Sequence, residues 1–156
     1  MLKHEQPLTR SKLPPSAKWG EVANAGFQIL PDALLKYQTE LGLDATDMLV
    51  LINITMHWWY EDQRPFPRTT TIAKRMGVSV RTVQRSASKL QKLKLIERKK
   101  EDSPSGDGER TVYDLTGLIR SLEPHAKNDE GYRPRFGDWD SDDDLDAVEF
   151  DDEVPY

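Results

Sequence analysis

The stretch TTTIAKRMGVSVRTVQRSASKLQKL, residues 69–93, constrains the fold more than any other part of the sequence. Its first eight residues place Ile72, Ala73 and Met76 at helical spacing, so that all three can face a core. The following Gly-Val-Ser is typical of a tight turn, because Gly77 can adopt a positive φ at no Cβ cost. We therefore expect a short amphipathic helix that stops at this glycine.

A second helix is predicted to begin directly after the turn and to cover residues 80–93. Ser79 suits its N-cap, because a serine hydroxyl can accept a hydrogen bond from the first free backbone amides. The side chains on one side of this helix are Val83, Ala87, Leu90 and Leu93. Those on the opposite side are Arg81, Arg85, Ser88 and Lys92. One face is therefore expected to pack, and the other to be positive and polar.

Three elements are predicted before this pair. Residues 26–30, GFQIL, form a short extended segment, and residues 31–43 form a helix. The strongly apolar residues 44–63 predict one long helix. Asp44 or Thr46 could cap this helix, and the prolines of the following PFP would end it.

Two strands and a short helix are predicted after the pair. Residues 95–100 and 110–115 alternate like strands, and the intervening EDSPSGDGE is rich in turn residues, so a β-hairpin is expected. Residues 116–122 add a final short helix. Residues 1–22 indicate a flexible arm, because they are rich in Pro, Lys and Ser without a sustained apolar period. From Glu123 onward apolar residues are sparse and Asp dominates, which predicts disorder.

The charge of the chain is divided unevenly. Residues 64–100 carry twelve Lys or Arg against one acid, a net charge of 12 − 1 = +11. Residues 123–156 carry three basic residues against thirteen acids, a net charge of 3 − 13 = −10. The overall charge of −5 hides both regions. Such asymmetry suggests a polyanion-binding part joined to an acidic tail.

The composition argues against several kinds of site. The chain has no cysteine, which excludes disulfides and thiolate metal sites and favours a reducing cytoplasm. No apolar run approaches the ~20 residues of a membrane-spanning helix, and the N-terminus does not look like a secretory signal. His4, His57 and His125 are scattered without paired ligands, and no catalytic triad, phosphate-binding loop or paired-carboxylate site is evident. We expect a non-enzymatic protein without metal or cofactor.

The helix pair and hairpin resemble a known family. LPDALLKYQTELGLDATDMLVLINI and PFPRTTTIAKRMGVSVRTVQRSASKLQKLKLIER resemble the winged helix-turn-helix domains of bacterial, plasmid and phage replication or regulatory proteins, over residues 26–122. IAKRMGVSVRTVQRSASKL is the most specific part. The resemblance implies a mainly α fold with a small β-hairpin. Residues 23–122 would form the DNA-binding domain, between a flexible arm (1–22) and a disordered acidic tail (123–156).

The same resemblance implies how duplex DNA is contacted. The helix of residues 80–93 would enter the major groove, where Arg can bridge guanine and Gln can bridge adenine. The threonines that open the preceding helix would hold phosphates, and Thr69 would take over the capping role that relatives give to a serine at the position of Arg68. The hairpin, or wing, would touch the backbone or minor groove. The residues so assigned are Thr69, Thr70, Thr71, Arg81, Thr82, Gln84, Arg85, Ser88, Lys89, Lys92, Arg98, Lys99, Lys100 and Arg110. Monomer and dimer on DNA both remain open.

Two features allow more than one interpretation. Trp58, Trp59 and Tyr60 could form a stacking platform for single strands, although packing at the end of an apolar helix is the more frequent role of such residues. The acidic tail could be a solvated extension. It could also fold back on the positive helix face and suppress non-specific DNA binding, which is mostly electrostatic.

A third interpretation of the tail comes from its last residues. FDDEVPY closely resembles the C-terminal tip of bacterial single-stranded DNA-binding protein, which ends in an aromatic, three acids, an Ile, a Pro and a terminal Phe. The resemblance implies an aromatic anchor with a free carboxylate, and acids that meet a basic rim. The matching residues of this docking tip, within residues 148–156, are Phe150, Asp151, Asp152, Glu153, Val154, Pro155 and Tyr156.

Together the two resemblances predict a cytoplasmic, nucleoid-associated bacterial protein. It would be a DNA-binding adaptor of the plasmid or phage replication-initiation type, which recruits a host replication or repair protein through its tail. A transcription regulator with an autoinhibitory acidic tail, and a decoy that blocks host proteins reading such tips, are the alternatives.

Overall fold

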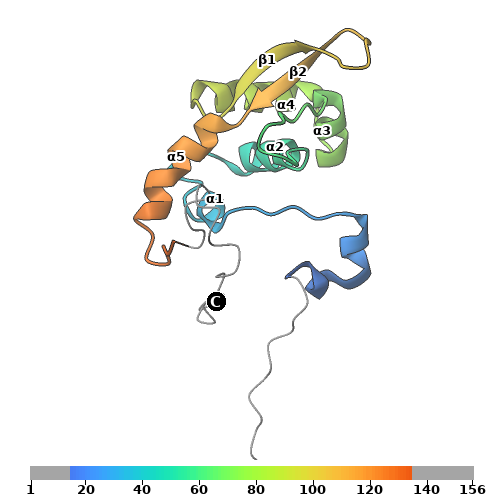
Figure 1. The fold of residues 1–156 in the computed structure, drawn as a ribbon. Helices are drawn as coiled ribbons and strands as arrows, with labels where there is room; N and C mark the ends of the chain where they lie inside the picture. Colours follow the sequence, from blue (N-terminus) through green and yellow to red (C-terminus); the bar gives the residue numbers. More distant parts are fainter. Residues whose placement is uncertain (1–14, 135–156) are drawn as a thin grey trace, which may run out of the picture.

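The computed structural model describes residues 15–134, and Figure 1 shows a group of helices from which one β-hairpin projects. The helices are η1 (Pro15–Ala25), α1 (Asp32–Lys36), α2 (Ala45–Thr55), α3 (Thr69–Met76), α4 (Val80–Lys92) and α5 (Thr116–Lys127). The strands are β1 (Glu97–Asp102) and β2 (Glu109–Asp114). The predicted fold class, mainly α with a small β-hairpin, is confirmed. The predicted docking tip, residues 148–156, lies outside the described residues.

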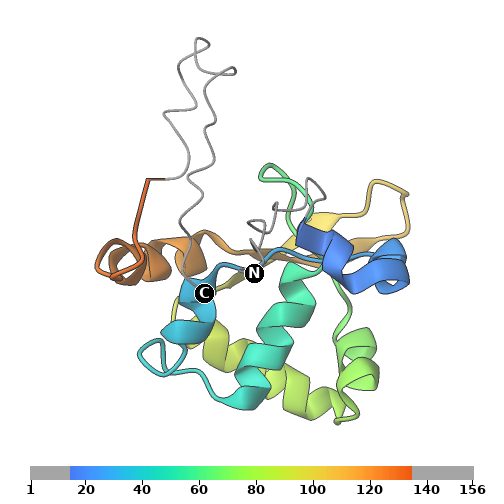
Figure 2. The same cartoon turned by 90° about the horizontal axis from the view of Figure 1, so that it is seen from below.

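The core lies where the apolar stripes of α2, α3 and α4 meet (Figure 2). Leu51, Ile54, Ile72, Val83 and Leu90 are each 0% exposed there. Full burial of such a side chain stabilises the folded state by about 1.5–3 kcal/mol. The core therefore fixes α4 against α2 and α3 along one face and leaves its other face to solvent.

The predicted hairpin forms after α4, with β1 starting two residues later than the strand predicted at 95–100 and β2 one residue earlier than that predicted at 110–115. β1 and β2 pair antiparallel in a register that runs from Glu97 opposite Asp114 to Asp102 opposite Glu109. The backbone N–H of Ser103 donates to the carbonyl of Gly108 over 2.8 Å and closes the loop. One strand face packs on the core through Tyr113, which is 2% exposed.

The long helix predicted over residues 44–63 is wrong at its end, because α2 stops at Thr55. The chain then unwinds through short turns, in which the N–H of Trp58 donates to the carbonyl of Thr55 over 2.9 Å. Further on, the carbonyl of Pro65 accepts from the N–H of Tyr113 over 2.9 Å, which holds this segment extended beside β2. A helix continuing to the prolines would forfeit this contact, so tertiary pairing overrides the local apolar pattern.

Ordered structure also continues past Glu123, where disorder was predicted. α5 extends to Lys127, and Asp129 beyond it accepts a hydrogen bond from the hydroxyl of Tyr37 over 2.6 Å. The ammonium of Lys36 lies 3.2 Å from the same carboxylate, and α1 packs beside α5 (Figure 1). The expectation of disorder for residues 123–134 is therefore wrong, because α1 supplies partners that the tail sequence does not reveal.

Candidate nucleic-acid interface

The turn between α3 and α4 has the predicted construction. Gly77 ends α3 in the left-handed conformation, with φ 66°. The hydroxyl of Ser79 caps α4 by accepting from the N–H of Thr82 over 3.1 Å. This tight connection leaves three residues between the end of α3 and the start of α4. Arg81, Gln84 and Arg85, in the N-terminal half of α4, are exposed to solvent.

The exposed face of α4 carries most of the predicted contacts. Arg81, Gln84, Arg85 and Lys92 are all exposed, and none has a hydrogen-bond or ion-pair partner among residues 15–134. Val83, Ala87 and Leu90 are buried on the opposite face, as predicted, whereas Leu93 is 37% exposed at the C-cap. Three of the four polar side chains occupy the first half of the helix, which is the part that reaches base edges in helix-turn-helix proteins.

The N-terminus of α3 carries the three threonines that are predicted to hold phosphates. Arg68 is the N-cap and makes no side-chain capping bond, and Thr69 does not take that role. Thr70 and Thr71 are exposed and Thr69 is half-buried. The N–H groups of Thr69 and Thr70 have no backbone partner among the described residues, whereas the N–H of Thr71 donates to the carbonyl of Arg68. Free amides at a helix start favour an anion such as a phosphate.

Lys89 extends from α4 toward α2, and its side chain is 42% exposed. Its ammonium contacts the carboxylate of Asp47 on α2 and lies 3.5 Å from that of Asp44. Asp47 is 2% exposed and also accepts from the hydroxyl of Ser86 over 2.7 Å. Asp44 and Asp47 exchange backbone and side-chain hydrogen bonds of 3.0 and 2.8 Å as a capping box. We name these four residues the α2–α4 clamp.

The clamp gives Lys89, one of the predicted DNA contacts, partners inside the protein. A buried carboxylate is tolerated only when hydrogen bonds and a counter-charge compensate it. Burial by itself raises the pKa of Asp47, but the hydrogen bonds from Lys89, Ser86 and Asp44 outweigh it, so that the pKa lies below its usual range. The hydrogen bond to Asp47 raises the pKa of Lys89. The charge of Lys89 is thus balanced within the protein.

We expect Asp47→Ala to lower the free energy of unfolding by about 2 kcal/mol or more, because it removes half of a capping box, takes the acceptor from Ser86 and leaves Lys89 with only its longer ion pair to Asp44. Asp47→Asn tests the charge alone. Because the pKa of Asp47 is lowered in the folded state, its ionised carboxylate stabilises the protein above about pH 4. This stabilisation is lost as the pH falls through the folded-state pKa. The difference in Tm between the native chain and Asp47→Asn should therefore shrink on acidification. A difference that is constant from pH 7 to pH 3 would contradict an ionised Asp47.

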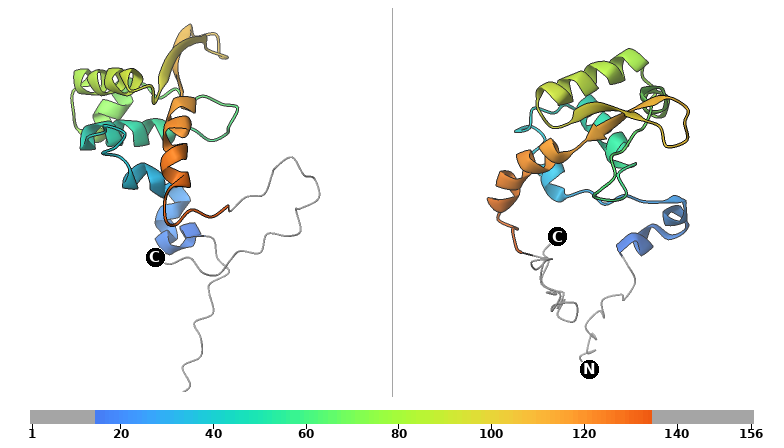
Figure 3. Two further views of the ribbon diagram at one scale, coloured as in Figure 1. Left: turned by 90° about the vertical axis from the view of Figure 1, so that its left-hand side faces the viewer. Right: turned by 45° about the horizontal axis from the view of Figure 1, so that its top comes forward.

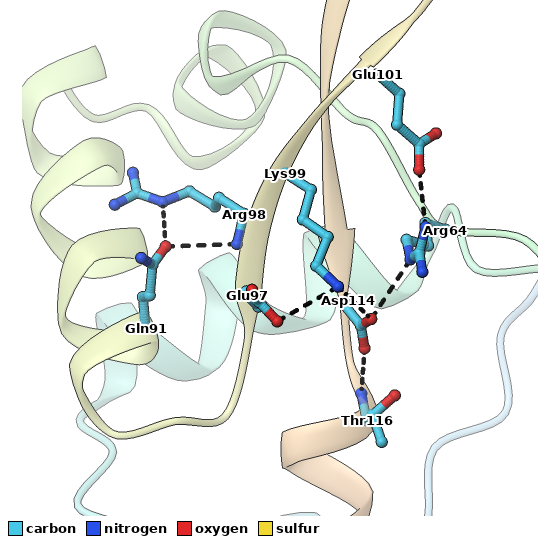
Figure 4. Close-up of polar contacts among 8 residues, drawn as sticks. All are labelled: Arg64, Gln91, Glu97, Arg98, Lys99, Glu101, Asp114 and Thr116. Atoms are coloured by element: carbon cyan, nitrogen blue, oxygen red, sulfur yellow. Dashed lines mark hydrogen bonds and ion pairs between the residues drawn. The ribbon is translucent and has the colours of Figure 1, made fainter.

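The cations of the wing are largely engaged inside the protein (Figure 4). Arg98 donates to the side chain of Gln91 over 2.9 Å and to Ser88 over 3.2 Å, which ties β1 to α4. Lys99 lies 3.3 Å from the carboxylate of Asp114. The hydrogen bonds from Thr116, together with Lys99, hold the pKa of Asp114 well below its usual range.

Arg64 joins the wing to the loop before α3. Its guanidinium lies 2.8 Å from Glu101 and 3.4 Å from Asp114 (Figure 4). The hydrogen bond to Glu101 raises the pKa of Arg64. Arg64 belongs to the basic region of residues 64–100, and in the structure its guanidinium links the loop before α3 to the hairpin.

The outer half of the wing is acidic. Lys100 donates to Thr111 over 2.9 Å, and the guanidinium of Arg110 lies 3.9 Å above the ring of Phe66. Beyond them, the side chains around the tip are Glu101, Asp102, Asp107 and Glu109. Like charge repels phosphate, so the tip itself is not expected to attract DNA, and the wing contacts predicted for the cations nearer the body stay a prediction.

The aromatic run after α2 is divided by the fold. Trp58 packs against the core as partly buried, whereas Trp59 and Tyr60 are 66% and 65% exposed. Figure 3 shows the loop of residues 56–64 on the other side of the hairpin from α4. The run is therefore not brought together with the α4 face.

Some important residues were not predicted. Asp47 occupies a position of the apolar stripe of α2, with Val50, Leu51 and Ile54 at i+3, i+4 and i+7. An acid on such a stripe signals a buried partner of opposite charge. Ser86 lies on the packing face of α4 and is buried, with 4% of its surface exposed. No sequence pattern links Arg64 to Glu101, which is 37 residues away.

A comparison with protein families agrees with this geometry. Residues 41–96 match the model of a helix-turn-helix domain family. The matched segment contains α2, α3, α4 and the connections between them, and the hairpin that follows it is consistent with a winged form. A comparison with curated proteins finds no match. The helix-turn-helix domain supports DNA binding by this chain.

Two further findings concern the described part of the chain. Within residues 15–134 no helix has the length and apolar character needed to cross a membrane. In the same range, no three His, Asp or Glu side chains gather in a way that could hold a metal ion.

Proposed function

We propose that this chain binds duplex DNA sequence-specifically, with α4 in the major groove and the start of α3 on the phosphate backbone. The observation that carries the proposal is the exposed set Arg81, Gln84 and Arg85 on the first half of α4, without partners among the described residues. Arg and Gln make bidentate contacts with guanine and adenine, each worth about 1–3 kcal/mol of discrimination. Lys92 and the α3 threonines add contacts to phosphate.

Selection from a pool of random duplexes tests the proposal directly, because a specific binder enriches one motif. Recovery of random sequence after repeated rounds would overturn it.

The salt dependence of binding to the selected duplex can be compared between two matched variants, Lys92→Met and Lys89→Met. Lys92→Met removes an exposed cation and should reduce the slope of log K against log salt by about 0.9. Lys89→Met removes a cation that the α2–α4 clamp already neutralises, so its slope should equal that of the native chain. Equal loss of slope in both variants would place Lys89 on DNA and contradict the assignment of the clamp.

We further propose that the DNA-bound protein is an adaptor of the replication-initiation type, which recruits a host replication or repair protein. Support for this role comes from the sequence of the tip, residues 148–156. A rigid Pro155 next to Tyr156 suits an anchor that enters an apolar pocket, and the three preceding acids suit a basic rim. The basic region, residues 64–100, then has a nucleic acid as its partner, and the acidic region, residues 123–156, has a protein.

A labelled peptide of residues 148–156 should bind a host protein that reads the tip of single-stranded DNA-binding protein, and the genuine tip should compete with it. Tyr156→Ala should weaken this binding at least ten-fold, because the aromatic anchor is lost. Val148→Ala, outside the matched tip, is the control and should bind like the native peptide. Fluorescence anisotropy measures all three. If Tyr156→Ala binds as well as the native peptide, the adaptor role is wrong.

A transcription regulator with an autoinhibitory tail is the second candidate, and the opposed charges of +11 and −10 favour it. In that case, deletion of residues 135–156 raises the affinity for non-specific DNA at low salt, and the increase is smaller at high salt. An adaptor keeps the same non-specific affinity after this deletion and loses only its protein partner. A decoy would bind the partner equally well when its DNA-binding face is mutated.

A further inference from the structure

The first part of the described chain exposes an unusual amount of apolar surface. Trp19, Val22, Phe27 and Ile29 are 60%, 66%, 55% and 89% exposed, and we name these four side chains the arm surface. Residues 22–31, which hold three of these four side chains, contain no charged residue, although 31% of the chain is charged. Trp19 lies between Lys18 and Glu21. A solvated linker would share the charge of the rest of the chain, so a neutral apolar surface indicates an interface.

Packing within the described chain does not account for the order of this segment. η1 spans 11 residues and is broken at Gly20, where φ is 55° and ψ is −134°. Isolated helices of fewer than ~12–15 residues are marginal in water. Among residues 15–134, the side-chain hydrogen bond of η1 is local, from Asn24 to Glu21 over 3.0 Å. Figures 1 and 3 show η1 standing away from the helices of the body.

The extended segment after η1 is nevertheless anchored to the domain. Leu30 packs against the core, and Gln28 accepts a hydrogen bond from the hydroxyl of Thr55 over 3.1 Å. Successive side chains of an extended chain point in opposite directions, so Phe27 and Ile29 face outward while Gln28 and Leu30 face the body. The outward pair is thus held in place before any partner binds, which lowers the entropic cost of association.

We propose that the arm surface packs against the arm surface of a second copy of this chain, forming a two-fold dimer. A neutral, apolar patch is self-complementary, as an isologous interface requires, and apolar interfaces are typical of homodimers. A Phe or Trp side chain buries about 150–250 Å² when fully covered, and Val and Ile bury less. Four side chains that are more than half exposed offer roughly 500 Å² per copy, so two copies reach the ~1,000 Å² expected of a specific interface.

The position of the arm surface is compatible with DNA binding. η1 and the extended segment lie at the opposite end of the domain from α4 and the hairpin (Figures 1 and 3). A dimer formed there leaves both α4 faces exposed. If the proposed function holds, the two α4 helices read two half-sites related by the same two-fold axis, but the dimer itself is formed without DNA.

Sedimentation equilibrium of the full chain without DNA tests the proposal. The native chain should be dimeric at micromolar concentration, and Phe27→Ser with Ile29→Ser should raise the dissociation constant at least 100-fold. Leu49→Ser with Ile119→Ser is the matched control, because both side chains are 51% exposed on α2 and α5. The control should remain dimeric, and circular dichroism should show unchanged helix in all variants.

Cross-linking gives a second measurement that does not depend on loss of association. The chain has no cysteine, so Ile29→Cys should form a disulfide-linked dimer on mild oxidation, whereas Ile119→Cys should not. A native chain that is monomeric at all concentrations, or dimers that persist in the arm-surface variant, would overturn the proposal. Failure of DNA selection with an intact dimer would overturn only the proposed function.

Discussion

Replacement of Arg81 and Arg85 together by alanine should abolish sequence-specific DNA binding while leaving the fold intact. Each guanidinium is expected to contribute about 1–3 kcal/mol to base recognition. Loss of both corresponds to at least a 30-fold weaker affinity for the selected duplex and up to roughly 10⁴-fold. Both side chains are exposed and unpaired among residues 15–134, so the Tm should change by no more than a degree or two. Anisotropy titrations and thermal denaturation measure the two effects.

The control for this experiment removes the same charge elsewhere. Lys18→Ala with Arg120→Ala takes away two exposed cations on η1 and α5. It should change the affinity for the selected duplex by less than three-fold, because long-range charge is screened beyond about 10 Å at 0.1 M salt. If the control loses as much affinity as the α4 variant, recognition is general electrostatics and α4 is not the reading helix.

The α3–turn–α4 unit could be predicted in detail because its determinants are local. Gly77 and Ser79 adopt the conformations that their chemistry favours in isolation, and the 3.6-residue period places Val83 and Leu90 in the core. The DNA contact predicted for Lys89 stays a prediction, but its ammonium is engaged by Asp47 on α2. Lys89 follows Ser88 by about 100° around the helix, which turns it toward α2.

The remaining errors come from contacts between distant segments. α2 stops at Thr55, and beyond it Pro65 pairs with Tyr113 on β2, 48 residues later in the chain. The wing was predicted from alternation, but the roles of its cations depend on Arg64 and Asp114, which the fold brings together (Figure 4). Periodicity predicts which residues form an element and which side is apolar. Periodicity does not predict which charged side chains pair between elements. That pairing leaves some cations without an internal partner, and these are the ones expected to contact DNA.

The junction between α4 and α5 depends on a glycine whose importance the sequence does not indicate. Gly117 lies in the first turn of α5, and a Cβ atom there would be 2.0 Å from the carbonyl oxygen of Lys94. Lys94 itself has a positive φ of 59°, so its carbonyl is fixed by the sharp turn between α4 and β1. The first turn of α5 thus packs directly on that backbone, and the contact sets the direction in which α5 leaves the sheet.

We expect Gly117→Ala to destabilise the protein by about 3 kcal/mol or more, because neither backbone can move without disrupting β1 or α5. Helix propensity alone predicts the opposite sign, since alanine is favoured over glycine in helices. Gly106→Ala is the matched control: its φ is 78°, but a Cβ there would meet nothing within 4 Å. The control should lose only about 1–2 kcal/mol, from backbone strain. Urea denaturation of the two variants measures the difference, and a Gly117→Ala protein as stable as the native chain would show that α5 does not approach Lys94 this closely.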